Sequence, residues 1–411
     1  MNLEILAKEM KSHLLETIIP FWKGLRDDKY GGYYGWHSYD LGLNMKAEKG
    51  CILNSRITWF FSNVMLLYKK GLITDGDFIK YGYTALDIKD EAKHAYNFLV
   101  SKCIDKKYGG VFWSVDYDGT PADTTKHCYN QAFCIYALAS YYDAIGDRQA
   151  LELAKRLVGI IEENFTDEVG FLEAKTVDFK PESNEKLSEN GVMADKTMNT
   201  LLHVFEAYSE LYRVSGDSYV GERLAWIMDT FADKIYNPAL HRQEVFFDAN
   251  YNSIIDLHSY GHDIETAWLM DRGVKILGDK KYEEKMYPIT KDLTENIYKV
   301  AFDGRSLANE CDKGVVNEWR IWWVQAEAVL GFVNGYLADN SKGKYLDAAV
   351  KEWEFIKEFV WDKRGGSEWF SSVDKNGKPD DTKAIVEQWK CPYHNGRMCL
   401  EVMKRAAGIE V

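Results

Sequence analysis

Two histidines occupy positions where an imidazole could exchange a proton with a bound substrate. In the segment HSYGHDIETAWLMD, Ser259 is placed to cap a helix whose first turns carry His262 and Glu265 at i and i+3 on one face. A carboxylate at that spacing could fix the tautomer of His262 and raise its basicity. A surface ion pair would show the same spacing, so this segment alone does not separate catalysis from structure.

The second histidine is His394, in WKCPYHNGRMCLEV, where Pro392 fits the first turn of the last helix. The positive end of a helix dipole disfavours an imidazolium. A helix start would therefore keep His394 neutral near pH 7 and able to accept a proton. Taken alone, a histidine in such a place is more often structural than catalytic.

A cation and a third histidine complete a set suited to proton transfer beside a carbonyl. Arg56, in ILNSRITWFFSN, is permanently positive and could stabilise the charge of an enediolate. His203 shares a helix face with Asn199, four residues earlier. The alternatives are a buried ion pair for Arg56 and a hydrogen-bonded core position for His203.

Aromatic residues make up 14% of the chain, with 13 Trp and 26 Tyr. Most such side chains fill cores, but flat indole faces also stack on sugar rings. Trp322, Trp323, Trp389 and Tyr129 are the candidates for a sugar-binding surface. Periodicity does not say which of the adjacent Trp322 and Trp323 would face a ligand.

Three other kinds of site remain open at this point. His258, His262 and Glu265 have a spacing compatible with metal ligation, but the segment is not an H-E-x-x-H motif, and we expect no metal. A glycoside hydrolase would need two carboxylates, whereas the candidates here are mostly histidines. A carbohydrate-binding protein without catalysis would need the tryptophans but not the histidines.

A repeated pattern predicts the elements that position these residues. Six segments each contain charged turn residues followed by a short aromatic or β-branched stretch, and most of them also contain glycine. Each segment is typical of a short hairpin or loop. Their markers are Gly31, Gly109, Gly170, Val245, Gly304 and Gly365. Each interval holds two amphipathic helices, separated by Gly-Asp turns at 146–147, 216–217 and 278–279. Six hairpins of helices in two concentric rings, an all-α (α/α)6 barrel formed by residues 1–411 as one domain, are favoured over an open helical solenoid.

The candidate residues share a place within this repeat. Arg56, Tyr129, Asn199, Trp323 and His394 follow their markers by 19 to 29 residues, and His262 and Glu265 occupy the comparable place in the fourth unit. In a barrel, this phase predicts one site at the end that carries the hairpins.

Composition excludes several function classes. The net charge of -13 and the absence of a basic cluster argue against nucleic acid as a partner. No apolar run reaches the length of a membrane span, and the first residues form an amphipathic helix rather than a signal peptide. Seven cysteines without a C-x-x-C pair fit reduced thiols. We therefore expect a cytoplasmic protein, and a monomer.

Five segments resemble motifs of the N-acylglucosamine 2-epimerase superfamily, in particular its cellobiose 2-epimerase branch. They are SRITWFFSN, KTMNTLLHVFEAYSELY, HSYGHDIETAWLMD, WWVQAEA and WKCPYHNGRMCLEV. The likeness runs from Arg26 to Arg405. It implies an (α/α)6 barrel that interconverts glucose and mannose at the reducing end of β-1,4-linked disaccharides, such as cellobiose and lactose, without a cofactor.

The resemblance also implies roles for the candidate residues. His262 and His394 would be the acid–base pair, and Glu265 would orient His262. His203 and Arg56 would bind and polarise the oxygens at C1 and C2. Asn199, Tyr129, Trp389 and Trp322 or Trp323 would line the sugar subsites. An aldose–ketose isomerase and an N-acylglucosamine or monosaccharide 2-epimerase of the same fold remain as alternatives.

Overall fold

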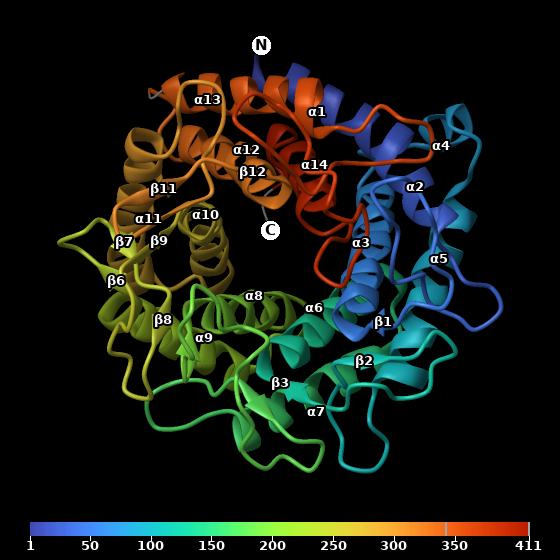
Figure 1. Cartoon of the computed structure of the whole chain (residues 1–411), viewed down its shortest axis with the longest axis horizontal. Helices are drawn as coiled ribbons and strands as arrows, with labels where there is room; N and C mark the ends of the chain where they lie inside the picture. Colours follow the sequence, from blue (N-terminus) through green and yellow to red (C-terminus); the bar gives the residue numbers. More distant parts are fainter. Residues whose placement is uncertain (342, 410–411) are drawn as a thin grey trace.

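The computed structural model describes residues 1–341 and 343–409 and arranges their helices as two concentric rings (Figure 1). The inner ring consists of α3 (Cys51–Lys69), α6 (Cys128–Ile145), α8 (Met198–Ser215), α10 (Tyr260–Leu277), α12 (Trp322–Ala338) and α14 (His394–Ala406). The outer ring consists of α5 (Ala85–Phe98), α7 (Arg148–Asn164), α9 (Ser218–Thr230), α11 (Lys280–Val300), α13 (Gly343–Phe355) and the N-terminal pair α1 (Leu3–His13) and α2 (Ile19–Gly24). The predicted (α/α)6 barrel is confirmed. The short helix α4 (Asp75–Lys80) is additional to the two rings.

The helices of the two rings differ in burial. In α3, every residue from Cys51 to Leu67 is buried, which is typical of a helix packed on all sides. The outer helix α7 instead buries a single stripe that includes Ala150, Ala154 and Leu157. Polar side chains on the inner helices therefore need partners inside the barrel. Within the described ranges, no helix has both the length and the apolar character that crossing a membrane requires.

The predicted Gly-Asp turns are confirmed at the ends of three inner helices. Gly146, Gly216 and Gly278 end α6, α8 and α10 with positive φ angles of 84°, 64° and 66°, a conformation that glycine adopts without steric cost. The aspartate after each glycine caps the next outer helix through its side chain. These turns define the basal end of the barrel.

Short strands lie at the other end, where the inner helices begin. The strand before an inner helix pairs with the strand that follows the next outer helix. The pairs are β1 (Lys49–Gly50) with β2 (Ser114–Val115), β3 (Lys126–His127) with β4 (Ala174–Lys175), β5 (Lys196–Thr197) with β8 (Phe246–Phe247), β9 (Leu257–Ser259) with β10 (Glu310–Asp312), and β12 (Arg320–Ile321) with β13 (Ser372–Val373). Local hairpins also occur, β6 (Tyr236–Asn237) with β7 (Arg242–Gln243) and β10 with β11 (Val315–Asn317). The expectation of self-contained hairpins was thus incomplete, because five pairs join consecutive units.

The barrel closes between the first and last units. His37, after α2, forms an antiparallel bridge with Val386, before α14, in the position that the strand pairs occupy elsewhere. Helix α1 packs against α14, and α14 packs against α3. The chain therefore forms a closed ring and not an open solenoid.

A buried cation recurs two residues before the start of an inner helix. Each of these side chains contacts an aspartate of the preceding turn: Lys49–Asp27 at 2.6 Å, Lys126–Asp105 at 2.7 Å, Lys196–Asp167 at 2.5 Å and Arg320–Asp303 at 2.6 Å. In the fourth unit, His258 takes this position and contacts Asp263 at 2.8 Å. The four cation–aspartate pairs tie the starts of α3, α6, α8 and α12 to a preceding turn, and so fix the height of the side chains in the first turns of these helices.

We predict that Asp105→Asn lowers the free energy of unfolding by about 3 to 5 kcal/mol, because Lys126 would keep its charge in a fully buried position without a counterion. Asp118→Asn is the matched control, since Asp118 accepts a backbone hydrogen bond in an exposed turn and pairs with no lysine in the described contacts. Urea denaturation measures both variants. Equal effects of the two substitutions would contradict the assigned role of the buried pairs.

Candidate active site

The first turns of the inner helices bring the predicted site residues together. They come from all six inner helices: Arg56 on α3, Tyr129 on α6, Asn199 and His203 on α8, His262 and Glu265 on α10, Trp322 and Trp323 on α12, and His394 on α14. The ring of Trp323 lies 4.8 Å from that of His262 and 5.4 Å from that of His394. Tyr129 lies 5.0 Å from His203. The repeat phase thus predicted a convergence that the structure contains.

A single guanidinium, that of Arg397 on α14, holds three carboxylates from three other inner helices. It donates to Glu206 at 2.6 Å, to Glu327 at 2.7 Å and, in a short contact, to Glu265. It also donates to the hydroxyl of Tyr393, which in turn donates to Glu206. All of these side chains are buried. Sequence reasoning missed Arg397, Glu206, Glu327 and Tyr393.

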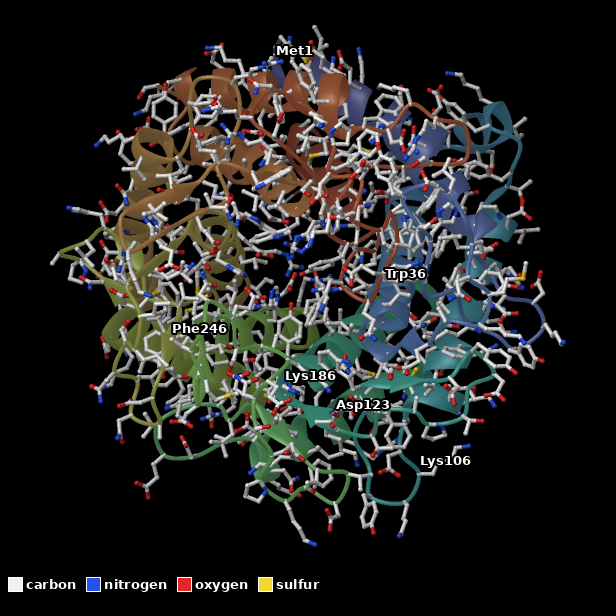
Figure 2. The ribbon with its side chains drawn as sticks, viewed as in Figure 1. Met1, Trp36, Lys106, Asp123, Lys186 and Phe246 are labelled. Carbon is white, nitrogen blue, oxygen red and sulfur yellow. The ribbon has the colours of Figure 1, made fainter. Side chains whose placement is uncertain are left out.

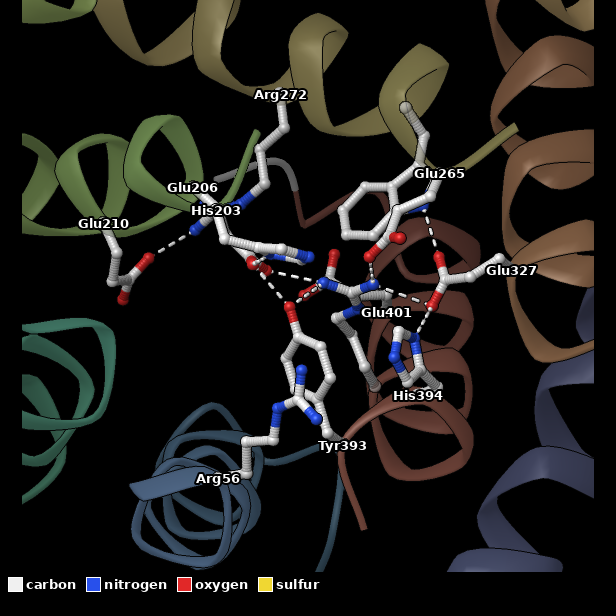
Figure 3. Close-up of polar contacts among 12 residues, drawn as sticks. Arg56, His203, Glu206, Glu210, Glu265, Arg272, Glu327, Tyr393, His394 and Glu401 are labelled. Atoms are coloured by element: carbon white, nitrogen blue, oxygen red, sulfur yellow. Dashed lines mark hydrogen bonds and ion pairs between the residues drawn. The ribbon is translucent and has the colours of Figure 1, made fainter. Parts of the chain in front are cut away.

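Two of these carboxylates orient histidines (Figure 3). Glu206 Oε2 lies 2.9 Å from His203 Nδ1, and Glu327 Oε1 lies 2.7 Å from His394 Nδ1. Because a carboxylate accepts and does not donate, each Nδ1 is assigned the proton. The Nε2 of both rings is then left with a lone pair that can accept a proton.

The three carboxylates share too little positive charge to be ionised equally. Burial raises the pKa of Glu206, but Arg397 and the bond from His203 outweigh it and lower this pKa to about 2. Burial and the neighbouring Glu327 raise the pKa of Glu265 to about 8. Burial also raises the pKa of Glu327, against the effects of Arg397 and of the Trp268 indole, which donates to it at 2.8 Å. The pKa values of Glu265 and Glu327 are therefore raised, whereas that of Glu206 is lowered.

The predicted pairing of His262 with Glu265 is wrong. His262 Nδ1 lies 2.7 Å from Ser259 Oγ, and Glu265 faces Arg397 instead. Ser259 does precede the helix, but its side chain contacts the imidazole rather than capping the backbone. At Gly261, an added Cβ would lie 2.5 Å from the Trp323 ring, so glycine is what allows α12 to approach His262 this closely.

All three site histidines are held neutral. Burial lowers the pKa of His262 to about 3 and also lowers that of His203. Burial, followed by the charges of Arg397 and Arg56, lowers the pKa of His394 well below its usual range. A neutral His394 was predicted, but mainly for another reason, the helix dipole. His394 is indeed the first residue of α14, with Pro392 just outside the helix.

Arg56 is held in place by aromatic rings and by two oxygens. It donates to the hydroxyl of Tyr129 at 2.9 Å and to the carbonyl of Trp389 at 3.2 Å. Its guanidinium lies 4.1 Å from the ring centre of Phe133 and 4.6 Å from that of Tyr393. No carboxylate contacts Arg56 among the described residues, so the predicted alternative of a buried ion pair is not what the structure contains.

The aromatic candidates divide into two groups. Trp323 lies between the two histidines and is partly exposed, whereas Trp322 is buried, with Lys390 4.9 Å from its ring centre. Trp389 lies at the other side of the site, 5.8 Å from Tyr129. Asn199 is partly exposed, and its buried Oδ1 has no hydrogen-bond partner in the described part of the chain.

A further tryptophan, missed from the sequence, packs beside this surface. Trp113 lies 5.5 Å from Trp389. Lys186 reaches over the Trp113 ring at 5.1 Å and pairs with Asp123 at 2.5 Å, joining the loops of two neighbouring units (Figure 2). Loop contacts of this kind connect segments distant in sequence and leave no periodic signal.

The metal alternative from the sequence is not assembled. His258 pairs with Asp263, His262 with Ser259 and Glu265 with Arg397. A different trio, Glu265, Glu327 and His394, has ligand atoms within 4.8 Å of one another. Here Arg397 Nη2 donates to both carboxylates, so both already have a cationic partner.

Comparison with known proteins decides the family. The family model described as N-acylglucosamine 2-epimerase matches residues 32–395. The chain belongs to this family. As a member it is an isomerase.

Individual relatives cover nearly the whole chain. It is 47% identical to a cellobiose 2-epimerase of Ruminococcus albus, over 98% of this chain and 100% of that protein. It is 48% identical to one of Eubacterium cellulosolvens, over 97% and 98%. Among solved structures, cellobiose 2-epimerase from Bacillus thermoamylovorans superimposes with a TM-score of 0.90 at 41% identity, over 98% of this chain and all of that one.

We predict that Glu327→Gln reduces kcat of this epimerase about 10²-fold or more, because an amide can donate to His394 Nδ1 and so place the proton on Nε2. Glu352→Gln is the control. Glu352 is also buried, on the outer helix α13, and burial raises its pKa well above the usual range, which favours the uncharged form. Steady-state kinetics on both variants, with circular dichroism to verify folding, test this. A Glu327→Gln enzyme with near-normal kcat would refute the assigned tautomer.

Proposed function

We propose that this protein is a cellobiose 2-epimerase, which interconverts glucose and mannose at the reducing end of β-1,4-linked disaccharides such as cellobiose and lactose. The observation that carries the proposal is the pair of neutral histidines, His262 and His394, on either side of Trp323. Full-length similarity to proteins of that name supports the substrate class.

The chemistry begins with opening of the sugar ring. The hydrogen at C2 becomes removable only when the C1 aldehyde can delocalise the charge into a cis-enediolate. A group whose pKa is well below 7 is present as a free base throughout the neutral range, and His262 and His394 both meet that condition. One takes the C2 proton and becomes an imidazolium, which later releases that proton to solvent. The other first takes a proton from solvent and then returns it to the opposite face of the enediolate. Positioned general bases contribute about 10²- to 10⁴-fold each.

Charge on the enediolate oxygens needs a permanent cation nearby. Arg56 has its guanidinium among Tyr129, Phe133 and Tyr393, in surroundings that exclude water. There its attraction for a developing oxyanion is stronger than in solution. Arg56 and the Nε2 of His203 polarise the oxygens at C1 and C2, while Asn199, Trp323 and Trp389 hold the sugar.

Glycoside hydrolysis is less well supported by the same geometry. A hydrolase uses two carboxyl groups that flank the glycosidic bond. Here Glu206, Glu265 and Glu327 all face the Arg397 guanidinium from within the barrel. Each of the three donates no proton in the contacts described and accepts a hydrogen bond from Arg397. An aldose–ketose isomerase would use the same enediolate and remains the alternative that experiment must separate.

We predict that the EDTA-treated protein, incubated with cellobiose in D₂O, produces a mannose-type reducing end with deuterium at C2. NMR of the C1 and C2 positions measures this directly. A fructose-type end would instead identify an isomerase, and released glucose a hydrolase. Either outcome, without epimer, would refute the proposal.

We predict further that His262→Gln and His394→Gln each lower kcat about 10²- to 10⁴-fold, because each removes a proton-transfer group. Cellobiose affinity should change little. His241→Gln is the control, since His241 is exposed and contacts Asp292 on the outer helix α11. Turnover by NMR and binding by calorimetry would be compared. Loss of binding with retained turnover would be inconsistent with acid–base roles.

A further inference from the structure

A second concave region lies at the basal end of the barrel, away from the histidines. It is a cavity of about 270 Å³ lined by residues near the C-terminal ends of all six inner helices and by α11. Its walls include Glu210, Arg272 and Glu401, which lie one or two helical turns beyond the Arg397 cluster. Nothing in the proposed epimerisation uses this cavity.

The cavity is rich in cations, although the protein is acidic overall. Seven basic side chains line it: Lys70, Arg213, Arg272, Lys275, Lys291, Lys404 and Arg405. Four carboxylates accompany them: Asp143, Glu210, Asp271 and Glu401. Seven against four leaves a surplus of three positive charges among the described residues, in a chain whose net charge is -13. Cations concentrated in a low-dielectric concavity attract small anions.

The arginines keep donors that the carboxylates do not use. Arg272 donates to Glu210 at 2.5 Å through Nη2, and Arg405 donates to Glu401 at 2.5 Å through Nη1. Within the described residues, no other carboxylate hydrogen-bonds to either guanidinium. Their Nε and second Nη groups remain as fixed, charged donors, the geometry that suits the oxygens of a phosphate or carboxylate.

Two lysines complete the rim. Lys70 and Lys291 are exposed and form no ion pair with the described residues. Helix C-terminal ends stabilise neighbouring cations, which explains why this charge is tolerated without a ligand. The helix ends do not occupy the hydrogen-bond donors of the two lysines.

We propose that the basal cavity is a binding site for a compact multivalent oxyanion, of the diphosphate or tricarboxylate kind. The oxyanion binds between Arg272 and Arg405 and is held from the rim by Lys70 and Lys291. Leu66 and Leu337 form the apolar part of the wall. This site is separate from the sugar site and does not depend on the proposed function.

Isothermal titration of the full chain with inorganic pyrophosphate tests the proposal. One ion should bind per chain, more weakly as ionic strength rises. Because a charge-assisted hydrogen bond is lost with each substitution, Lys70→Gln/Lys291→Gln and Arg405→Gln should each weaken binding about tenfold. The double lysine variant changes only exposed side chains, so we expect it to fold like the unmodified protein. Titration with citrate separates phosphate-type from carboxylate-type ligands.

Two controls locate the ion. Lys106→Gln removes an exposed lysine from a loop at the opposite end (Figure 2) and should leave affinity unchanged. His394→Gln should also bind pyrophosphate normally. The proposal is overturned if no binding is detected, if Lys106→Gln weakens binding as much as the basal variants, or if His394→Gln abolishes it.

Discussion

The ion cluster around Arg397 is the interaction on which the rest of the site depends. One guanidinium in the middle of the barrel satisfies carboxylates from α8, α10 and α12 at once. An unpaired buried charge costs several kcal/mol. The four inner helices are therefore held in one relative register. Glu206 contacts His203 and Glu327 contacts His394. The positions of these two histidines therefore follow from the packing of the barrel.

The same cluster influences the protonation state of His203 and His394. Burial disfavours an imidazolium, and the charge of Arg397 disfavours it further at His394. A carboxylate on Nδ1 would ordinarily raise the pKa of a histidine, as it does in part for His203. Here the guanidinium neutralises much of that carboxylate charge. Glu206 and Glu327 can thus fix the tautomer without turning the histidines into permanent acids.

The sequence predicts the barrel and the end at which the site lies, because both depend on periodic features. Gly-Asp turns and apolar stripes repeat with the units, and Arg56, Tyr129 and His394 share a phase within them.

The Arg397 cluster was missed because its members meet across the barrel axis, and no local spacing records that distance. One signal was present: Glu206 follows His203 by three residues, the same i, i+3 relation that links His262 to Glu265. There the relation misled, since Arg397 competes for Glu265. The strand pairing between units was missed for the same reason, because it also joins segments that are distant in sequence.

The most direct test of this account is the protonation of His394 in the unliganded protein. Nitrogen-15 NMR of histidine-labelled protein, with His394→Gln to assign the signals, reports the proton on each ring nitrogen as pH is lowered. The account predicts a neutral ring with the proton on Nδ1 and no titration near the ordinary value of about 6.5. A ring that titrates near that value, or one that carries its proton on Nε2, would contradict it.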